Sequence, residues 1–293
     1  MSRPQKEAQR KGVTAMERKL GLSSCGKTLT RELFEQYAES GITYMEISGQ
    51  PSIYDSLDFP LLQKWASETG VVIRSLHLPF YPFDTYDISS LDENVRKAAI
   101  SSHTRLIERA SENGIKIFVI HPSGEPIDDS DRRRKIEVTK QSFSELADVC
   151  ERLGSVLAVE DLPRTCLGNC SKELLELVED ERLRVCFDTN HLLGEDIEHF
   201  ILAVGDRFIS THVSDYDTIN ERHWLPGEGV IDWISLLNTL DKVGYDGPIL
   251  YEVHFIAPVT IIRDRDLTCA DVRANYDSLL SGVIPAAIGK ANV

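Results

Sequence analysis

The stretch IKIFVIHPSGEPIDDSDRRRKIEVTKQSFSELADVCERLGSVLAVED, residues 115–161, contains one complete strand–helix–strand unit. Its apolar runs at 115–120 and 156–159 have the length and composition of strands that are buried on both faces of a parallel sheet. The segment between them, 131–153, has helical periodicity and is followed by Gly154, a residue type that commonly ends helices. This unit predicts a parallel sheet whose strands are connected by helices.

The same alternation continues along the chain in both directions. Apolar runs bounded by turn residues predict eight strands, at 19–23, 44–47, 72–76, 115–120, 156–159, 185–187, 208–211 and 249–251. Segments with helical spacing predict eight helices, at 30–40, 60–69, 92–113, 131–153, 171–178, 197–204, 231–243 and 269–280. This strict alternation favours a closed (β/α)8 TIM barrel over an open doubly wound sheet, because no GxGxxG motif follows the first strand.

Length and composition are consistent with one such barrel. The 293 residues are 42% hydrophobic and 27% charged, which is close to the average for globular domains. We expect a single TIM-barrel domain over residues 18–293, preceded by a mobile N-terminal segment at 1–17. The sequence shows no secretory signal, no apolar stretch long enough to cross a membrane and no CxxC pair among its six cysteines. The expected location is therefore the cytoplasm.

The charge balance argues against nucleic acid as a partner. The chain has 32 Lys and Arg residues against 47 Asp and Glu, for a formal net charge of −15. A surface of this sign repels a phosphate backbone. Two acidic stretches, EPIDDSD at 125–131 and SDYDTINE at 214–221, follow predicted strands and would add to this repulsion. We expect a small molecule to bind instead.

Residue types that bind metals follow most of the predicted strands. They are His77 after the third strand, His121 after the fourth, Glu160 after the fifth, Asp188 and His191 after the sixth, His212 after the seventh and Glu252 after the eighth. In a (β/α)8 barrel the carboxyl ends of the strands form the active face. Three carboxylates buried at one mouth would repel one another strongly without a cation. We therefore expect a divalent metal, and mixed carboxylate and imidazole ligands suit Mn²⁺, Co²⁺, Zn²⁺ or Fe²⁺ better than Ca²⁺.

Each of these residues also has an ordinary structural explanation when it is considered alone. A single His after a strand is more often a hydrogen-bonded core residue than a ligand, and an Asp there often caps the next helix. Cys166 and Cys170 form the only close cysteine pair, and two thiolates alone do not complete a tetrahedral metal site. The expectation of a metal rests on the strand-end residues taken together.

Eight phrases of the sequence, considered jointly, resemble one known protein family. They are HLPF at 77–80, DISSLDENVRKAA at 87–99, VIHPSGEP at 119–126, VEDLP at 159–163, FDTNH at 187–191, STHVSDYD at 210–217, HWLPGEGVIDW at 223–233 and ILYEVH at 249–254. The family is that of the xylose isomerase-like TIM barrels, which contains sugar and sugar-phosphate isomerases and epimerases and also the endonuclease IV-type AP endonucleases. The resemblance extends over residues 18–255. It implies a metal-dependent isomerase or epimerase that acts on a sugar or sugar derivative.

The resemblance also implies a role for each strand-end residue. Glu160, Asp188, His212 and Glu252 match the four ligands of one catalytic divalent metal, for which Mn, Co or Zn is expected. Glu160 and Glu252 would in addition exchange protons with the substrate, and His191 would contact its oxygens. A metal bound to a carbonyl and a neighbouring hydroxyl acidifies the C–H bond between them, so that two carboxylates can remove and return a proton through an enediolate.

Further substrate contacts are predicted from His77 and His121, from Glu46 after the second strand, and from Arg222 in a loop at the open face. For Glu46 and Arg222, a solvated or ion-paired role is an equally good explanation.

Two other activities stay open. The endonuclease branch of the family binds three zinc ions, and its additional ligand positions are matched by His77 and His121 for one ion and by His191, Glu221 and His223 for another. Glu221 replaces the usual Asp. The same single-metal site could also serve a lyase or dehydratase acting on a keto-sugar or inosose, because loss of a β-hydroxyl needs only a different fate of the enediolate. A homo-oligomer and a catalytically idle sugar-binding barrel are also compatible with the sequence.

Overall fold

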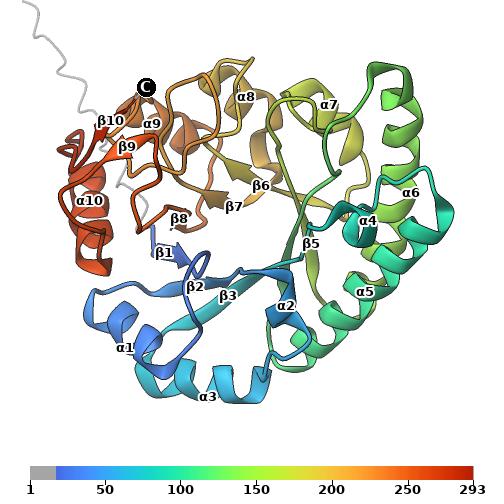
Figure 1. Cartoon of the computed structure of the whole chain (residues 1–293), viewed down its shortest axis with the longest axis horizontal. Helices are drawn as coiled ribbons and strands as arrows, with labels where there is room; N and C mark the ends of the chain where they lie inside the picture. The colour runs from blue at the N-terminus through green and yellow to red at the C-terminus, as the bar shows by residue number, and fades with distance from the viewer. Residues whose placement is uncertain (1–17, 293) are drawn as a thin grey trace, which may run out of the picture.

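The computed structural model describes residues 18–292, which form a barrel of parallel strands surrounded by helices (Figure 1). The strands are β1 (Leu20–Ser23), β2 (Tyr44–Ile47), β3 (Val72–His77), β4 (Ile117–Ile120), β5 (Val156–Glu160), β6 (Arg184–Asp188), β7 (Phe208–His212) and β8 (Ile249–Tyr251). They are hydrogen-bonded in the order β7-β6-β5-β4-β3-β2-β1-β8. All eight predicted strands are confirmed, whereas the segment 1–17 that we expected to be mobile lies outside the described residues.

Hydrogen bonds between the ends of β7 and β8 close the ring. The N–H of Val213 donates to the carbonyl of Leu250 at 2.7 Å, and the N–H of Glu252 donates to the carbonyl of Val213 at 3.1 Å. These bonds create a parallel bridge between Val213 and Tyr251. A doubly wound sheet would leave these two edges unpaired. The closed barrel is therefore confirmed, and the alternative of an open sheet is wrong.

Helices cover the outside of the barrel. The eight predicted helices correspond to α1 (Arg31–Glu39), α3 (Phe59–Thr69), α5 (Glu93–Glu112), α6 (Asp129–Arg152), α7 (Ser171–Leu177), α8 (Ile197–Val204), α9 (Trp233–Lys242) and α10 (Cys269–Leu280). Five short elements were not predicted: α2 (Pro51–Tyr54), α4 (Phe83–Tyr86), the 3-10 turn η1 (Gly205–Arg207), and the antiparallel pair β9 (Ile261–Ile262) and β10 (Lys290–Ala291). Such elements are too short to show a hydrophobic period. No helix among residues 18–292 has both the length and the apolarity needed to cross a bilayer.

Side-chain caps determine where the long helices begin. Thr30 accepts a backbone N–H of the first turn of α1, and Asp92 does the same for α5. Asp128 caps α6 by accepting the N–H of Ser130. The predicted start of α6 at Asp131 is therefore two residues late. Aspartates are favourable both as caps and in the first turn of a helix, so the sequence alone does not show which of them is the cap.

Alternation of side chains along the strands brings carboxylates to one end of the barrel. Successive side chains of a barrel strand point to its inside and its outside in turn. On β5 and β6, Ala158 and Cys186 belong to a small inner cluster, whereas Val159 packs in the larger cluster that includes the helices. Glu160 and Asp188 lie two residues beyond the inner residues of their strands. Their carboxylates therefore point into the barrel at its carboxyl end.

Candidate metal centre

Four of the predicted ligands converge at the carboxyl ends of β5 to β8. One ligand atom each from Glu160, Asp188, His212 and Glu252 lies within 4.8 Å of the other three. The first three residues end their strands, and Glu252 directly follows β8. The most exposed of the four is Glu252, at 9%. The barrel thus brings together residues that are up to 92 positions apart (252 minus 160) in a site largely shielded from water.

The charges in this cluster favour a bound cation. The Nδ1 of His212 lies 3.1 Å from Glu160, 3.5 Å from Glu252 and 4.0 Å from Asp188. Within the cluster itself, the one imidazole cannot neutralise all three carboxylates. The Oδ2 of Asp188 is buried and has no hydrogen-bond partner among residues 18–292, although buried carboxylate oxygens are normally bonded. A divalent metal would satisfy this oxygen, and the donor set suits Mn²⁺, Co²⁺ or Zn²⁺.

The pKa values of two of the carboxyl groups are shifted in opposite directions. Burial raises the pKa of Asp188, because its ionised form loses hydration. Burial acts in the same direction on Glu160, but the neighbouring imidazoles of His212 and His121 outweigh it and hold the pKa of Glu160 well below its usual value. Glu160 is therefore ionised at neutral pH, as a metal ligand or a general base must be.

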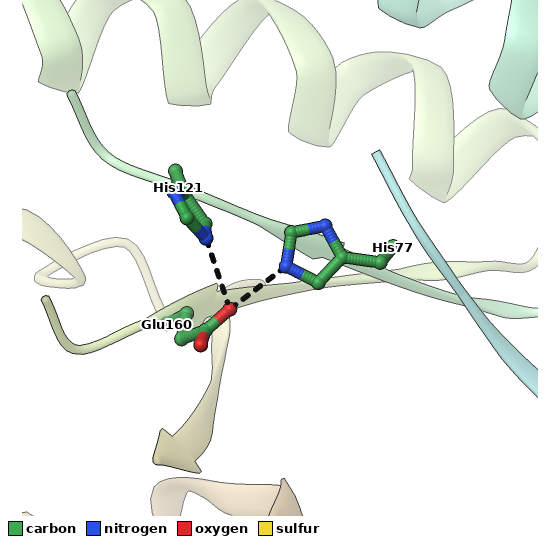
Figure 2. Close-up of side chains that lie close together, drawn as sticks. All are labelled: His77, His121 and Glu160. Carbon is green, nitrogen blue, oxygen red and sulfur yellow. Dashed lines mark hydrogen bonds and ion pairs between the residues drawn. The ribbon is translucent and has the colours of Figure 1, made fainter. Parts of the chain in front are cut away.

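Glu160 also faces a second cluster, with His77 and His121 (Figure 2). Its Oε2 lies 3.0 Å from Nε2 of His77 and 3.4 Å from Nε2 of His121, and both imidazoles point to this one oxygen. The three side chains are close enough to hold a metal together. Phe80 stacks on His121 with ring centroids 4.1 Å apart and contacts His77 edge-on at 5.7 Å. These ring contacts fix the direction of both imidazoles.

A third cluster contains His191, Glu221 and His223. The Nε2 of His191 lies 3.2 Å from Glu221, and its Nδ1 donates to the carbonyl of Asp161 at 2.7 Å. Burial raises the pKa of Glu221, but His191 and Arg164 outweigh this effect and lower it to about 2. Arg164 lies 3.2 Å from the Glu221 carboxylate. Glu221 is therefore an ionised group with partners on two sides.

Residues of all three clusters line one cleft of about 350 Å³, which is within the range of small-molecule sites. From the first cluster Glu160 and Glu252 line it, whereas Asp188 and His212 do not. Its lining also includes Cys25, Gln50, Phe83 and His254. Two residues beside it have left-handed backbones, Arg164 with φ of 55° and His223 with φ of 51°. This conformation is unfavourable for side chains other than glycine by roughly 1 kcal/mol or more. Such strain concentrates where a protein holds functional groups in place.

Two predicted substrate contacts, Glu46 and Arg222, are not among the residues that line this cleft. Glu46 is fully buried; its Oε1 lies 2.8 Å from Nε2 of His212, and its Oε2 accepts the hydroxyl of Ser75 at 2.7 Å. Arg222 is paired through two nitrogens with Asp217, at 2.8 and 2.7 Å. The geometry therefore favours the ion-paired alternative for Arg222. For Glu46 it favours contact with His212 over contact with substrate.

Residues that hold the ligands were missed in the sequence. Asp161 accepts the backbone N–H of Asp188 at 2.8 Å, and Asn190 donates from Nδ2 to the Asp188 carboxylate at 3.0 Å. The carboxamide oxygen of Asn190 accepts the N–H of His223 at 3.2 Å and so connects the loops after β6 and β7. Both residues lie within two positions of a ligand, in VEDLP and FDTNH. That proximity is the signal that could have identified them.

Comparisons with known proteins give a consistent result. The family described as Xylose isomerase-like TIM barrel matches residues 34–264. The uncharacterized protein MJ1311 of Methanocaldococcus jannaschii is 27% identical over 83% of this chain and 86% of its own length. The D-psicose 3-epimerase of Ruminiclostridium cellulolyticum is 25% identical over 74% of this chain and 76% of its own length. A crystal structure of a D-tagatose 3-epimerase-like protein superposes with a TM-score of 0.74 at 25% identity, covering 90% of this chain and 97% of that one.

Proposed function

The chain belongs to the xylose isomerase-like TIM-barrel family, and on that premise we propose that it is a divalent-metal-dependent isomerase or epimerase of a sugar or sugar derivative. The observation that carries this proposal is the buried group of Glu160, Asp188, His212 and Glu252 at the carboxyl end of the barrel. The similarity to a D-psicose 3-epimerase and to a D-tagatose 3-epimerase-like structure supports a sugar as substrate.

The two glutamates of the cluster are the groups proposed to transfer the proton. A metal held by the four ligands would polarise a substrate carbonyl and acidify the neighbouring C–H bond. Glu160 and Glu252 come from β5 and the end of β8, so they approach the centre of the barrel from different directions. One carboxylate can then remove a proton from one face of the substrate while the other returns a proton to the opposite face. This arrangement accounts for inversion at a carbon without a redox cofactor.

The remaining buried groups hold this machinery in position. Glu46 bonds the Nε2 of His212 and leaves its Nδ1 facing the carboxylates. Asp161 and Asn190 bond Asp188. Such partners of metal ligands orient them and tune their basicity. Glu46 is therefore assigned to orientation of His212.

His77, His121 and His191 line the cleft and have ring nitrogens close to Glu160 or Glu221. We assign them to contact with substrate oxygens. The two clusters that they form can also accept further metal ions, so the metal content per chain is a necessary measurement.

The decisive experiment uses Glu160→Gln and Glu252→Gln variants saturated with metal. A panel of ketoses, inososes and keto-glycosides is incubated in deuterated water, and turnover, deuterium uptake and bound metal are measured on the same samples. Glutamine can still offer an oxygen to a metal but cannot accept a proton at neutral pH. Turnover is expected to fall by about 10² to 10⁴ with metal retained, whereas the glutamate that remains can still exchange hydrogen for deuterium on its own face of the substrate.

His212→Ala is the comparison variant, because it removes a proposed metal ligand and leaves both proton-transfer glutamates in place. Its metal affinity should fall first, and its activity should fall as a consequence. A metal-saturated Gln variant whose turnover falls by less than about tenfold would contradict the proton-transfer roles. Full activity of the wild type after complete metal removal would contradict the metal dependence. Product analysis separates an isomer from a dehydrated product, which would instead indicate a lyase or dehydratase with the same site.

A trinuclear zinc AP endonuclease is the second candidate, because three ligand clusters lie at one face. The net charge of −15 argues against it, and Arg164 and Arg222 beside the cleft are paired with Glu125 and Asp217. About three zinc ions per chain together with cleavage of abasic DNA would support this activity. A single metal without nuclease activity would exclude it.

A further inference from the structure

A second cleft lies directly beside the metal-lined one. Its volume is about 610 Å³, compared with about 350 Å³ for the first cleft. It is formed by the loops after β1 and β2 together with α2 and α3, of which α3 lies next to α1 at the lower side of Figure 1. The metal-lined cleft alone is within the size range of small-molecule sites, so the second cleft offers room beyond a single sugar ring.

Three residues lie at the boundary between the two clefts. Gly26, Gly49 and Gln50 line both of them. Two of these three residues are glycines. A Cβ added to Gly26 would meet nothing within 4 Å, whereas one added to Gly49 would meet Cδ1 of Ile53 at 2.5 Å. A substituent attached to a ligand in the first cleft can therefore pass beside Gly26 into the second cleft.

The second cleft has a mixed lining, in which six of the fourteen residues are apolar, six are polar or charged and two are glycines. The apolar side chains that line it are Leu29, Ile53, Leu57, Leu61, Leu62 and Trp65. Leu61 remains 37% exposed, although it stands in a concave surface where a ligand could cover it. Binding of an apolar group against these side chains is favourable, because it removes apolar surface from water.

The charged residues of this lining are already engaged. The ammonium of Lys27 donates to the carbonyls of Ser23 and Cys25 at 3.3 and 3.2 Å and lies 3.9 Å from the ring centroid of Phe255. The carboxylate of Asp58 accepts the N–H of Leu61 at the start of α3. Both groups are thus held by hydrogen bonds, although neither forms an ion pair with another of residues 18–292.

We propose that the second cleft binds an apolar substituent of the substrate, so that the protein acts on a sugar derivative with an apolar aglycone. The proposal rests on the proposed function, because it places the sugar ring in the metal-lined cleft. The open space at Gly26 between the two clefts, together with the six apolar side chains of the second, favours this substituent as the occupant.

The test measures binding without turnover. Unreactive methyl, propyl, butyl and hexyl glycosides are titrated into the metal-loaded protein by calorimetry. If the alkyl chain enters the second cleft, each added methylene group should strengthen binding by about three- to fourfold. Equal affinity for the methyl and hexyl glycosides in the wild-type protein would overturn the proposal.

Two variants test the location of the alkyl chain. Leu61→Glu places a charge in the cleft, and Ser52→Trp fills it from an exposed position on α2. Both should reduce the hexyl-to-methyl affinity ratio to near one. Leu202→Glu is the matched control, since Leu202 is 55% exposed on α8, on the opposite side of the barrel in Figure 1, and this variant should keep the wild-type ratio. A ratio that persists in both cleft variants would refute the location.

Parallel assays with keto-sugars distinguish failure of this inference from failure of the proposed function. Turnover of free keto-sugars without any dependence of binding on alkyl length would leave the isomerase or epimerase in place and reject the apolar aglycone. Alkyl-dependent binding that disappears in Leu61→Glu, without turnover of any keto derivative, would retain the cleft and reject the proposed activity.

Discussion

Replacing Glu46 tests whether a residue outside the cleft controls the metal centre. The Glu46 carboxylate is fully buried and lies 2.8 Å from Nε2 of His212, on the side of the imidazole away from the metal-ligand cluster. Loss of such a partner typically weakens metal binding by about 10- to 100-fold. We therefore expect Glu46 variants to bind metal more weakly although no predicted ligand is changed.

The magnitude depends on the substitution. In Glu46→Gln the amide oxygen can still accept the Nε2–H of His212, but the NH2 group cannot accept the Ser75 hydroxyl, so the negative charge and that one hydrogen bond are lost. A hydrogen bond to a charged group contributes about 1.5–3 kcal/mol and a neutral one about 0.5–1.5, and a difference of about 1.4 kcal/mol corresponds to roughly tenfold weaker binding. Glu46→Ala also leaves a buried donor unsatisfied, which costs about 1–3 kcal/mol and brings the loss toward 100-fold.

The assay is titration of Mn²⁺ or Co²⁺ into metal-free protein, with the absorption spectrum of bound Co²⁺ as a second readout of ligand geometry. Ser75→Ala removes the contact with the other Glu46 oxygen and should have a smaller effect. Glu39→Gln on the exposed surface of α1 is the charge-matched control and should leave affinity unchanged. Wild-type metal affinity and spectrum in folded Glu46→Gln and Glu46→Ala proteins would refute the role of Glu46.

Three further outcomes are expected from the structure. His103 is fully buried, and burial lowers its pKa to about 4. As pH falls, the unfolded chain therefore takes up a proton at His103 at a higher pH than the folded protein does. The free energy of unfolding should fall by about 3 kcal/mol between about pH 6.5 and about pH 4. Urea unfolding of His103→Phe should show a smaller decrease in the free energy of unfolding over this pH range than the wild type. An equal decrease would exclude His103 as its origin. Arg263→Met leaves the buried carboxylate of Glu228 without its ion-pair partner. The free energy of unfolding in the same assay should fall by about 3–5 kcal/mol. A fall of about 1 kcal/mol or less, as for an exposed pair, would contradict this. Metal at 100 times its Kd should add about 2.7 kcal/mol to the free energy of unfolding, and an unfolding midpoint that does not respond to chelator would argue against a site in the native fold.

The linear pattern of the chain was enough to predict the strands and the end of the barrel at which the site lies. Apolar runs such as 156–159 are local features, and their length and composition predict buried parallel strands. Because side chains alternate along a strand, the inward positions of Ala158 and Glu160 are linked by a spacing of two residues. Metal-binding residue types at several strand ends could therefore be assigned to one face before any contact was known.

Contacts between distant residues depended on the closed barrel. The stagger of the strands determines that Glu160 is shared by two clusters and that Glu46 reaches His212 across 166 positions. The pairing of Arg222 with Asp217, by contrast, is a local contact within the loop after β7. The second cleft depends partly on α2, a single turn too short to carry a hydrophobic period. Local propensity and periodicity depend on neighbours along the chain, so the sequence alone determined the strands and helices. Burial and the grouping of the ligands depend on how strands far apart in sequence are placed around the ring. Only the tertiary structure decided these two features.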